Sequence, residues 1–300
     1  MMGAFDGKSA IVSGAAQGLG EAFARALAAE GAAVALFDLK EGVREVARDI
    51  EGANPGRTLA LVADVSLRED CERVVASAAE RFGGVDILVN NAGKWTQSLV
   101  TDPWEKALAD FDEIMDTNVK GVMMMGRLCV PRMLERGSGD IVNISTYYVV
   151  PARSDGTNQP GTDNYNASKW GLNGFTQAWA QYLARQNIRV NALAMGATDT
   201  AMLRGLWPAP QAPPADFVKT WMKPEELARL MIDLIKDGRS GENIGAWAGY
   251  PVELPERARP DSTLRMRPDF TGRPAAIYPL PPWDDLLEPV PVNMAGPRRT

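Results

Sequence analysis

Short apolar runs alternate with longer helix-patterned segments along most of the chain, and this alternation restricts the possible folds more than any other feature. The intervening segments, such as EAFARALAAEG and EDCERVVASAAERFGG, repeat their apolar residues near helical period and end at Gly or Asn. Strands that are buried on both faces are near-continuous apolar runs, and their alternation with helices forms right-handed βαβ units. The sequence therefore predicts an α/β fold with a doubly wound parallel sheet. The predicted strands are SAIVSG (9–14), AAVALFD (32–38), TLALVADV (58–65), DILVNNAG (86–93), GDIVNIST (139–146) and IRVNALAMG (188–196).

The pattern changes near residue 250. A helix is predicted over 224–237, with Pro224 in its first turn, and NIGAWAGY (243–250) is predicted as the last strand. Of the final 50 residues 11 are proline, so this segment cannot form a regular helix or a central strand. We expect a catalytic domain over 1–250 and a Pro-rich, irregular C-terminal extension over 251–300. This extension either clasps a partner subunit or covers a site, and disorder is the alternative.

Composition excludes several classes of function. The net charge of −6 leaves no basic stripe for nucleic acid or an anionic membrane, and favours a small-molecule substrate. No apolar run approaches the ~18 residues of a spanning helix. Two widely spaced cysteines and the lack of a secretory leader predict a reducing, cytoplasmic environment. The absence of histidine argues against histidine bases, Ser-His triads and most zinc sites, and we expect no metal.

A glycine-rich turn follows the first predicted strand and opens a helix. Its glycines, Gly14, Gly18 and Gly20, permit a tight turn and a close approach of the helix N-terminus to a pyrophosphate. Such spacing alone is also found in ordinary turns. The context strengthens the interpretation as a dinucleotide site, because Asp38 ends the second strand about twenty residues later. A carboxylate at this position binds ribose hydroxyls and repels a 2′-phosphate.

The surroundings of Asp38 favour NAD over NADP. Gln17 and Leu39 stand where a phosphate-binding protein carries arginine. Lys40 is either a solvated surface charge or a partial support for NADP.

At this point the sequence resembles the short-chain dehydrogenase/reductases, in their branch of about 250 residues, and the resemblance runs from about Phe5 to Gly249. Such proteins have a Rossmann-type fold. The motifs that carry the resemblance are Ser13-Gly14 through Gly20, Asp64-Val65, Asn90-Asn91-Ala92-Gly93, Asn118 in DTNVKG, IVNIST, Tyr165-Asn166-Ala167-Ser168-Lys169 and VNALAMGATDTAM.

The resemblance implies a complete cofactor site. Asp64 and Val65 would contact the adenine, Asn91 would lie along the cofactor, and the loop after the sixth strand would hold the nicotinamide carboxamide. That loop begins Met195-Gly196 rather than the usual Pro-Gly. The residues assigned to the cofactor are Ser13, Gly14, Gln17, Gly18, Leu19, Gly20, Asp38, Leu39, Asp64, Val65, Asn91, Ala92, Gly93, Tyr165, Lys169, Gly196, Thr198 and Thr200.

The catalytic prediction centres on Tyr165 and Lys169, which are four residues apart and so share a face of a helix. A free tyrosine is a poor base at neutral pH. We expect the adjacent ammonium and the positive nicotinamide to lower the pKa of Tyr165, so that it takes the proton of a secondary alcohol as hydride leaves. The resemblance implies that Lys169 fixes the nicotinamide ribose and that Asn118 anchors a water in a proton relay. A structural asparagine bonded to backbone is the alternative for Asn118.

A further hydroxyl must orient the substrate oxygen. Counted without a gap, the family's serine position is Thr146, and Ser145 is the alternative. Threonine can donate the same hydrogen bond, although its methyl group narrows the pocket.

The substrate pocket is predicted from aromatic side chains near the strand ends. From Thr146 to Tyr165 is 19 positions, longer than is usual in the family, and the polar, turn-forming insertion predicts an exposed loop at the pocket mouth. A lid is expected over about 197–223. The residues assigned to the substrate pocket are Trp95, Tyr147, Tyr148, Met195 and Trp207.

Together these features predict an NAD-dependent oxidoreductase that interconverts a secondary alcohol, bulky, cyclic or aromatic, and its ketone. The alternative is a non-catalytic nucleotide-binding scaffold or sensor on the same fold. We also expect a homodimer or homotetramer.

Overall fold

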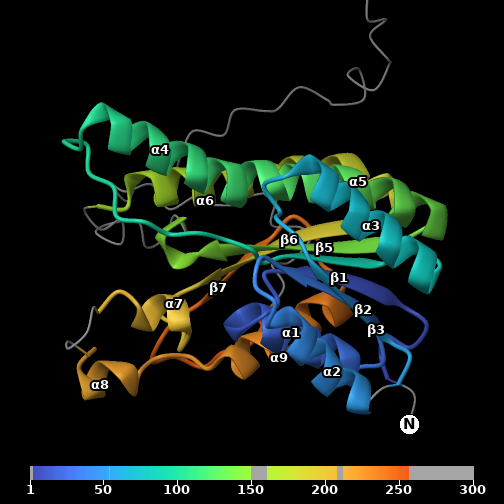
Figure 1. Cartoon of the computed structure of the whole chain (residues 1–300). Helices are drawn as coiled ribbons and strands as arrows, with labels where there is room; N and C mark the ends of the chain where they lie inside the picture. Colours follow the sequence, from blue (N-terminus) through green and yellow to red (C-terminus); the bar gives the residue numbers. More distant parts are fainter. Residues whose placement is uncertain (1–2, 54, 150–160, 208–211, 257–300) are drawn as a thin grey trace, which may run out of the picture. The chain divides into compact units, whose positions relative to one another are not determined.

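A computed structural model describes residues 3–53, 55–149, 161–207 and 212–256. Its centre is a seven-stranded, fully parallel sheet with the strand order β3-β2-β1-β4-β5-β6-β7, and helices cover both faces (Figure 1). The predicted doubly wound α/β fold of Rossmann type is confirmed. The strands are β1 (Ser9–Ser13), β2 (Ala33–Asp38), β3 (Thr58–Val62), β4 (Ile87–Asn90), β5 (Gly139–Thr146), β6 (Ile188–Met195) and β7 (Asn243–Ala246).

The helices form two layers, one on each face of the sheet. Helices α1, α2 and α9 lie on one face, and α3, α4, α5 and α6 lie on the other (Figure 1). Two short helices, α7 and α8, follow β6. The helices are α1 (Gly18–Ala29), α2 (Val43–Ala53), α3 (Arg68–Phe82), α4 (Trp104–Met115), α5 (Gly121–Arg136), α6 (Asp163–Leu183), α7 (Ala201–Arg204), α8 (Ala215–Val218) and α9 (Pro224–Asp237), with a π-helical turn η1 (Asp116–Lys120) and 3-10 turns η2 (Tyr147–Val149) and η4 (Ala184–Gln186).

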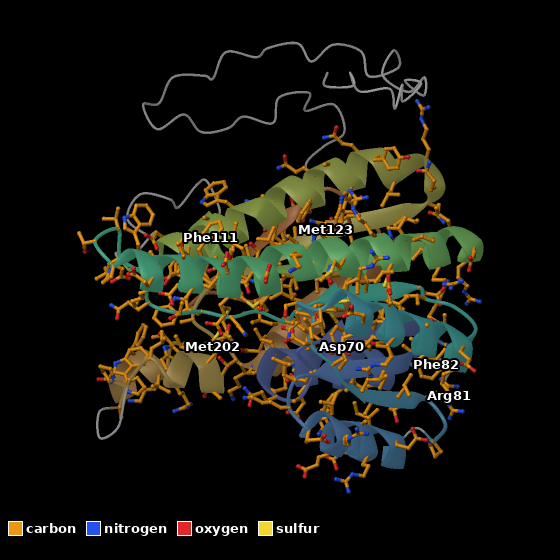
Figure 2. The ribbon with its side chains drawn as sticks, turned by 45° about the horizontal axis from the view of Figure 1, so that its top comes forward. Asp70, Arg81, Phe82, Phe111, Met123 and Met202 are labelled. Atoms are coloured by element: carbon orange, nitrogen blue, oxygen red, sulfur yellow. The ribbon has the colours of Figure 1, made fainter. Side chains whose placement is uncertain are left out.

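Each face of the sheet has its own apolar core. Phe23 and Leu27 of α1 pack with residues of α9 in one cluster. Cys71 of α3 and Met125 of α5 are fully buried in the other, and Met123, labelled in Figure 2, packs against it. Because the central strands are covered on both sides, their sequences are near-continuous apolar runs, as the sequence analysis assumed.

The strands β3, β4 and β7 are each three or four residues shorter than predicted, and specific hydrogen bonds mark the ends of β4 and β7. β4 stops at Asn90, since the N–H of Asn91 donates to the Ser13 hydroxyl (2.9 Å) and to the Val89 carbonyl (3.1 Å). β7 stops at Ala246, because the N–H of Tyr250 folds back to the carbonyl of Trp247 (3.2 Å) in a turn. The predicted helix over 224–237 has the bounds of α9.

The first residues of the C-terminal extension pack on the body of the fold. Val252 and Leu254 lie against the core that α1 and α9 share, and Arg239 donates to the carbonyl of Pro255 (3.0 Å). The rest of the extension, and residues 150–160 of the predicted loop, lie outside the described residues. No helix in the described part of the chain is long and apolar enough to cross a membrane.

Candidate active site

A cavity of about 610 Å³ lies at the carboxyl ends of the strands, where ligands bind in open α/β sheets. It brings together nearly all of the predicted site residues. The predicted residues that line it are Gly14, Gln17, Gly18, Leu19, Asp38, Leu39, Asp64, Val65, Asn91, Ala92, Gly93, Trp95, Thr146, Tyr147, Tyr148, Tyr165, Lys169, Met195, Gly196, Thr198, Thr200 and Trp207.

Three predicted residues, Ser13, Gly20 and Asn118, do not line the cavity. Ser13 and Gly20 instead shape the glycine-rich turn from behind. The Ser13 hydroxyl accepts the N–H groups of Asn91 and Ala92 (2.9 Å each), and the Asn91 amide donates to the carbonyls of Ser13 (2.9 Å) and Gly14 (3.1 Å). These bonds fasten the end of β1 to the end of β4.

Two positions in this turn, Gly14 and Gly20, require glycine because of the backbone conformation or the closeness of neighbouring atoms. Gly14 has φ +64°, a conformation that glycine adopts without strain. A Cβ at Gly20 would lie 2.6 Å from the Asn91 amide nitrogen and closer still to the Gly14 carbonyl oxygen. The first turn of α1 therefore presents bare backbone to the cavity, and this cradle fits the pyrophosphate of a dinucleotide.

Asp38 lies at the end of β2, beside this turn. Its carboxylate accepts the N–H groups of Ala16 (3.0 Å) and Lys40 (2.9 Å), and it lines the cavity. The Lys40 ammonium donates to the Gln17 side chain (3.2 Å) across the same edge. The negative charge is thus fixed in position where the ribose of a dinucleotide is expected.

Asp64 and Val65 line the cavity, and the Asp64 carboxylate is engaged within its own loop. One of its oxygens accepts both the backbone N–H (2.8 Å) and the hydroxyl (2.7 Å) of Ser66. Ala63 and Thr117 also line the cavity, and no sequence signal pointed to them.

Tyr165 and Lys169, the predicted catalytic residues, lie in the first two turns of α6. The start of this helix is fastened to the segment after β4, because the N–H of Ser98 donates to the carbonyl of Gly161 (3.1 Å) and the Ser98 hydroxyl bonds to Asp163. Tyr165 and Lys169 both face the cavity. The Lys169 ammonium lies 5.7 Å from the centre of the Tyr165 ring and donates to the Ile144 carbonyl (2.8 Å).

In the chain without a cofactor, burial rather than Lys169 is the main influence on the pKa of Tyr165. Burial raises the pKa of Tyr165 to about 12, and the hydrogen bond with Thr146 lowers it only in part. Burial also lowers the pKa of Lys169 to about 8. The ammonium lies against the ring and an opposing carbonyl, so the protein alone does not stabilise the phenolate. The expectation that the positive nicotinamide lowers the pKa of Tyr165 stays a prediction.

The two candidate hydroxyls differ in surroundings. Thr146 is hydrogen bonded to Tyr165, and it ends β5 beside the catalytic helix. The Ser145 hydroxyl is buried and has no hydrogen-bond partner among the described residues. Both residues line the cavity with Tyr165, and Thr146 is the one of the two that is bonded to Tyr165.

Asn118 lies in the π-helical turn η1, behind the catalytic pair. Its side chain is fully engaged, since its oxygen accepts the N–H of Lys94 (2.8 Å) and its amide donates to the Lys94 carbonyl and to the Ser168 hydroxyl (3.0 Å each). This is the structural alternative of the sequence analysis. A water in the predicted relay would have to bind the backbone of Asn118, and π-helical turns leave backbone groups available for such roles.

The loop after β6 lies over the same end of the cavity. The Thr198 hydroxyl donates to the Gly196 carbonyl (3.1 Å), and the Thr200 hydroxyl accepts the N–H of Leu203 (3.3 Å) and so caps α7. Both hydroxyls therefore hold the loop itself. Gly196 and Met195 line the cavity beside Tyr147.

Aromatic and aliphatic side chains of the segment after β6 form an apolar part of the cavity wall. Trp207 and Phe217 line it, together with Met202 of α7, which Figure 2 labels. Trp207, Phe217 and Trp221 pack on one another with ring centres 5.5–6.2 Å apart. Trp221 is buried behind the other two and does not reach the cavity. Lys94, Met202, Leu203 and Leu206 were not predicted, although each adjoins a motif that was.

The described residues contain no group of three or more acidic, cysteine or histidine side chains placed to hold a metal ion. The site combines a glycine cradle, a fixed carboxylate, a half-buried Tyr165 and a buried Lys169. The family model for short chain dehydrogenases matches residues 8–211. The chain belongs to the short-chain dehydrogenase/reductase family. It is thus an oxidoreductase of a family that uses a nicotinamide cofactor.

Known members cover most of this chain. A 3-oxoacyl-(acyl-carrier-protein) reductase of Thermotoga maritima is 34% identical over 82% of the chain and 99% of its own length. A cis-4-hydroxycyclohexanecarboxylate dehydrogenase of Sinomonas cyclohexanicum is 33% identical over 82% of the chain and 98% of its own length.

Solved structures agree with the fold. A 3-ketoacyl-(acyl-carrier-protein) reductase of Brucella melitensis, complexed with NADH, has a TM-score of 0.69 and 31% identity over 82% of this chain and 99% of its own. A short chain dehydrogenase of Burkholderia cenocepacia, in complex with NADP, has a TM-score of 0.71 and 31% identity over 82% of this chain and 98% of its own.

The close approach at Gly20 generates a stability prediction. Gly20→Ala should lower the free energy of unfolding by about 1–3 kcal/mol, because the new methyl group collides with backbone that the Asn91 bonds hold in place. Gly174→Ala is the matched control, since a Cβ there meets nothing within 4 Å. That control should gain about 0.5–1 kcal/mol from its better helix propensity. Urea denaturation measures both, and equal effects at the two positions would contradict the packing described for Gly20.

The buried Lys169 generates a pH prediction. Its pKa falls from the ordinary 10.5 to about 8, so burying the charged form costs about 3 kcal/mol. Below pH 8 both states are protonated and the full cost applies; between pH 8 and 10.5 the unfolded chain binds more protons, so stability rises with pH. The wild type should therefore gain stability relative to Lys169→Met across this window, as measured by urea denaturation at several pH values. A difference that does not change with pH would contradict this placement of the ammonium.

Proposed function

We propose that this chain is an NAD-dependent oxidoreductase that interconverts a secondary alcohol and its ketone, with Tyr165 as the acid/base. The observation that carries the proposal is the convergence of Tyr165, Thr146 and Lys169 on one cavity with the glycine cradle of α1. A bound nicotinamide would supply the hydride acceptor or donor. The protein would supply the proton transfer and the orientation of the substrate.

Each catalytic side chain has a distinct role in this proposal. The Tyr165 phenolate takes the hydroxyl proton as hydride leaves the carbon, and returns it in the reverse direction. Thr146 donates a hydrogen bond to the same substrate oxygen and holds it beside Tyr165. Lys169, held by the Ile144 carbonyl, has further N–H groups with which to bind the nicotinamide ribose.

Asp38 supports NAD as the cofactor. Its fixed carboxylate can accept the ribose hydroxyls, whereas a 2′-phosphate at the same place would meet like charge. The solved relatives do not decide the question, because one is described with NADH and another with NADP. Lys40 is the residue that would favour NADP, because its positive charge could bind a 2′-phosphate. Its hydrogen bond to Gln17 holds it at the edge of the site.

A bulky or cyclic substrate fits the apolar end of the cavity. Trp95, Met202, Leu206 and Trp207 line this end and offer few polar groups. One relative is named for a hydroxycyclohexane carboxylate and another for 3-oxoacyl chains. The aromatic side chains favour the cyclic alcohol.

We also propose that the chain acts as a homodimer or homotetramer. The outer surface of α4 supports association, because Trp104, Leu108 and Phe111 share one face and are 78%, 56% and 43% exposed. Figure 2 labels Phe111 on this helix.

The catalytic roles are tested with a panel of cyclic and aromatic alcohols and NAD⁺, following the absorbance of NADH. Tyr165→Phe should lower kcat by roughly 10³-fold or more through loss of the base. Thr146→Val should lower it by about 10²-fold through loss of one donor, and Ser145→Ala should change it little. Loss of turnover in Ser145→Ala alone would make Ser145 the orienting residue. Failure of every alcohol despite tight NADH binding would favour the non-catalytic scaffold.

Cofactor choice is tested by substituting Asp38. The wild type should bind NADH much more tightly than NADPH, and Asp38→Ser should lower this preference by at least about tenfold, which corresponds to about 1.4 kcal/mol. Fluorescence titration with each reduced cofactor measures the ratio without any substrate. Lys40→Met is the companion variant, and it should raise the preference for NADH. A wild type that prefers NADPH would overturn the assignment.

A further inference from the structure

A row of aromatic rings runs from the end of β7 to Tyr165. Trp247 packs edge-on against Tyr147, with ring centres 5.7 Å apart. Tyr147 lies 4.5 Å from Tyr148, which in turn lies edge-on to Tyr165 at 6.5 Å. The three tyrosines line the cavity, whereas Trp247 is not among the described residues that line it. Trp247 therefore stands behind the wall that the tyrosines present to a ligand.

The Tyr147 ring is also packed against glycine backbone. A Cβ placed on Gly196 would lie 3.5 Å from Cδ1 of Tyr147, so the loop after β6 contacts the ring directly. On the other side the indole of Trp247 lies over Gly245, where a Cβ would come within 3.0 Å of the indole. Because glycine leaves this space free, the indole can lie there and still reach Tyr147. The ring is thus held between the end of β6 and the end of β7.

A chain of hydrogen bonds connects β7 with the same wall at a second point. The side-chain amide of Asn243, in β7, donates to the side-chain oxygen of Asn173 in α6 (2.8 Å). The Asn173 amide in turn donates to the carbonyl of Val149 (3.2 Å). Val149 is the last residue of η2, the turn that carries Tyr147 and Tyr148. Two separate contacts from β7 therefore hold η2, one through a ring and one through this pair of amides.

We propose that the end of β7 sets the size of the substrate pocket through η2, with Trp247 and Asn243 as positioning residues that hold Tyr147 in place. This inference rests on the proposed function. A smaller side chain at Trp247 leaves empty space behind the Tyr147 ring. The ring can then move back, and the pocket accepts a substrate with a second ring. The loop after β6 keeps its place, because the N–H of Gly196 is bonded to the backbone carbonyl of Ala246 (2.9 Å) and not to a side chain.

The test compares cyclohexanol with decahydro-2-naphthol, in which the same ring is fused to a second one. The selectivity ratio is the affinity for decahydro-2-naphthol divided by the affinity for cyclohexanol. Binding is measured by isothermal titration of the NADH complex, where these alcohols bind but do not react, and turnover with NAD⁺ is measured separately. Trp247→Ala should raise the ratio about tenfold, because space for even one further methylene in an apolar pocket is worth this much. The same change should appear in kcat/KM.

Two control variants separate positioning from general damage to the fold. Trp247→Phe keeps a ring against Tyr147 and should keep the ratio of the wild type. Tyr250→Ala removes an aromatic ring from the same segment, at a side chain that is 58% exposed and is not among the described residues that line the cavity, and it should also keep the ratio. In Trp247→Ala the affinity for NADH and the kcat for cyclohexanol should stay within about twofold of the wild type, since the change concerns substrate binding. A purely structural role would instead lower stability and the turnover of both alcohols without moving the ratio.

A double-mutant cycle shows whether Trp247 acts through Tyr147. Tyr147→Ala removes the wall itself and should raise the ratio at least as much as Trp247→Ala does. The double variant should then exceed the larger single effect by no more than about twofold, because two residues that act through one contact are not additive.

The second contact is tested by the paired variant Asn173→Leu with Asn243→Val. Replacing both partners leaves neither amide buried without its bond to the other. This variant should raise the ratio by about threefold, in line with the modest net free energy of one hydrogen bond. It also decides the proposal should Trp247→Ala fail to fold.

The proposal is overturned by a ratio that stays unchanged in both Trp247→Ala and the paired asparagine variant, or by fully additive effects of Trp247→Ala and Tyr147→Ala. A shift in one of the two variants alone removes the other residue from the proposal. Absence of turnover in every variant, with the shift in the binding ratio preserved, would refute the proposed function while supporting the role of β7. Turnover with an unchanged ratio would have the opposite meaning, and a wild type that binds neither alcohol would overturn both.

Discussion

The fastening of β1 to β4 by Ser13 and Asn91 is the interaction on which the rest of the site depends. Parallel strands are bonded to one another only along their length, and their ends diverge into separate loops. Here one hydroxyl and one amide bridge the two ends with four hydrogen bonds of 2.9–3.1 Å. Because the bridge reaches the Gly14 carbonyl, it also fixes the first turn of α1. The cradle for the cofactor and the loop that leads to Trp95 are therefore positioned together.

Tyr165 and Lys169 are not stabilised in the same way. Burial destabilises the charged form of each side chain. The pKa of Tyr165 is raised to about 12 and that of Lys169 is lowered to about 8, in each case chiefly by desolvation. At neutral pH Tyr165 is therefore a neutral phenol, whereas Lys169 is still largely protonated. A positive charge brought into the cavity would reverse this balance for Tyr165, so the site is built to be completed by its cofactor.

The sequence predicted those parts of the fold and site that depend on local pattern. Apolar runs located every strand, Pro224 located the start of α9, and the four-residue spacing of Tyr165 and Lys169 placed both on one face of α6. What it could not supply is which partner each polar group takes. Ser13 and Gly20 were assigned to the cofactor and Asn118 to a relay water. Their contacts are with Asn91, Gly14 and Lys94, which lie outside the element of each residue.

The same limit applies to the pKa of Tyr165. Helical spacing places Lys169 on the correct face, but the direction of its ammonium is set by the Ile144 carbonyl of β5, and the desolvation of the phenol is set by the walls of the cavity. Neither is encoded in a four-residue motif. The π-helical turn at Asn118 was missed for a similar reason, because the surrounding residues have an ordinary helical pattern.

Trp247 gives the C-terminal edge of the sheet an influence on chemistry at its centre. It follows β7, the last strand in the sheet order, yet it supports Tyr147, which in turn contacts Tyr148 and so Tyr165. A change in the segment after β7 can therefore reshape the pocket without altering any catalytic residue. Substitutions in this segment could therefore change which substrate the pocket accepts, while Tyr165 and Lys169 stay in place.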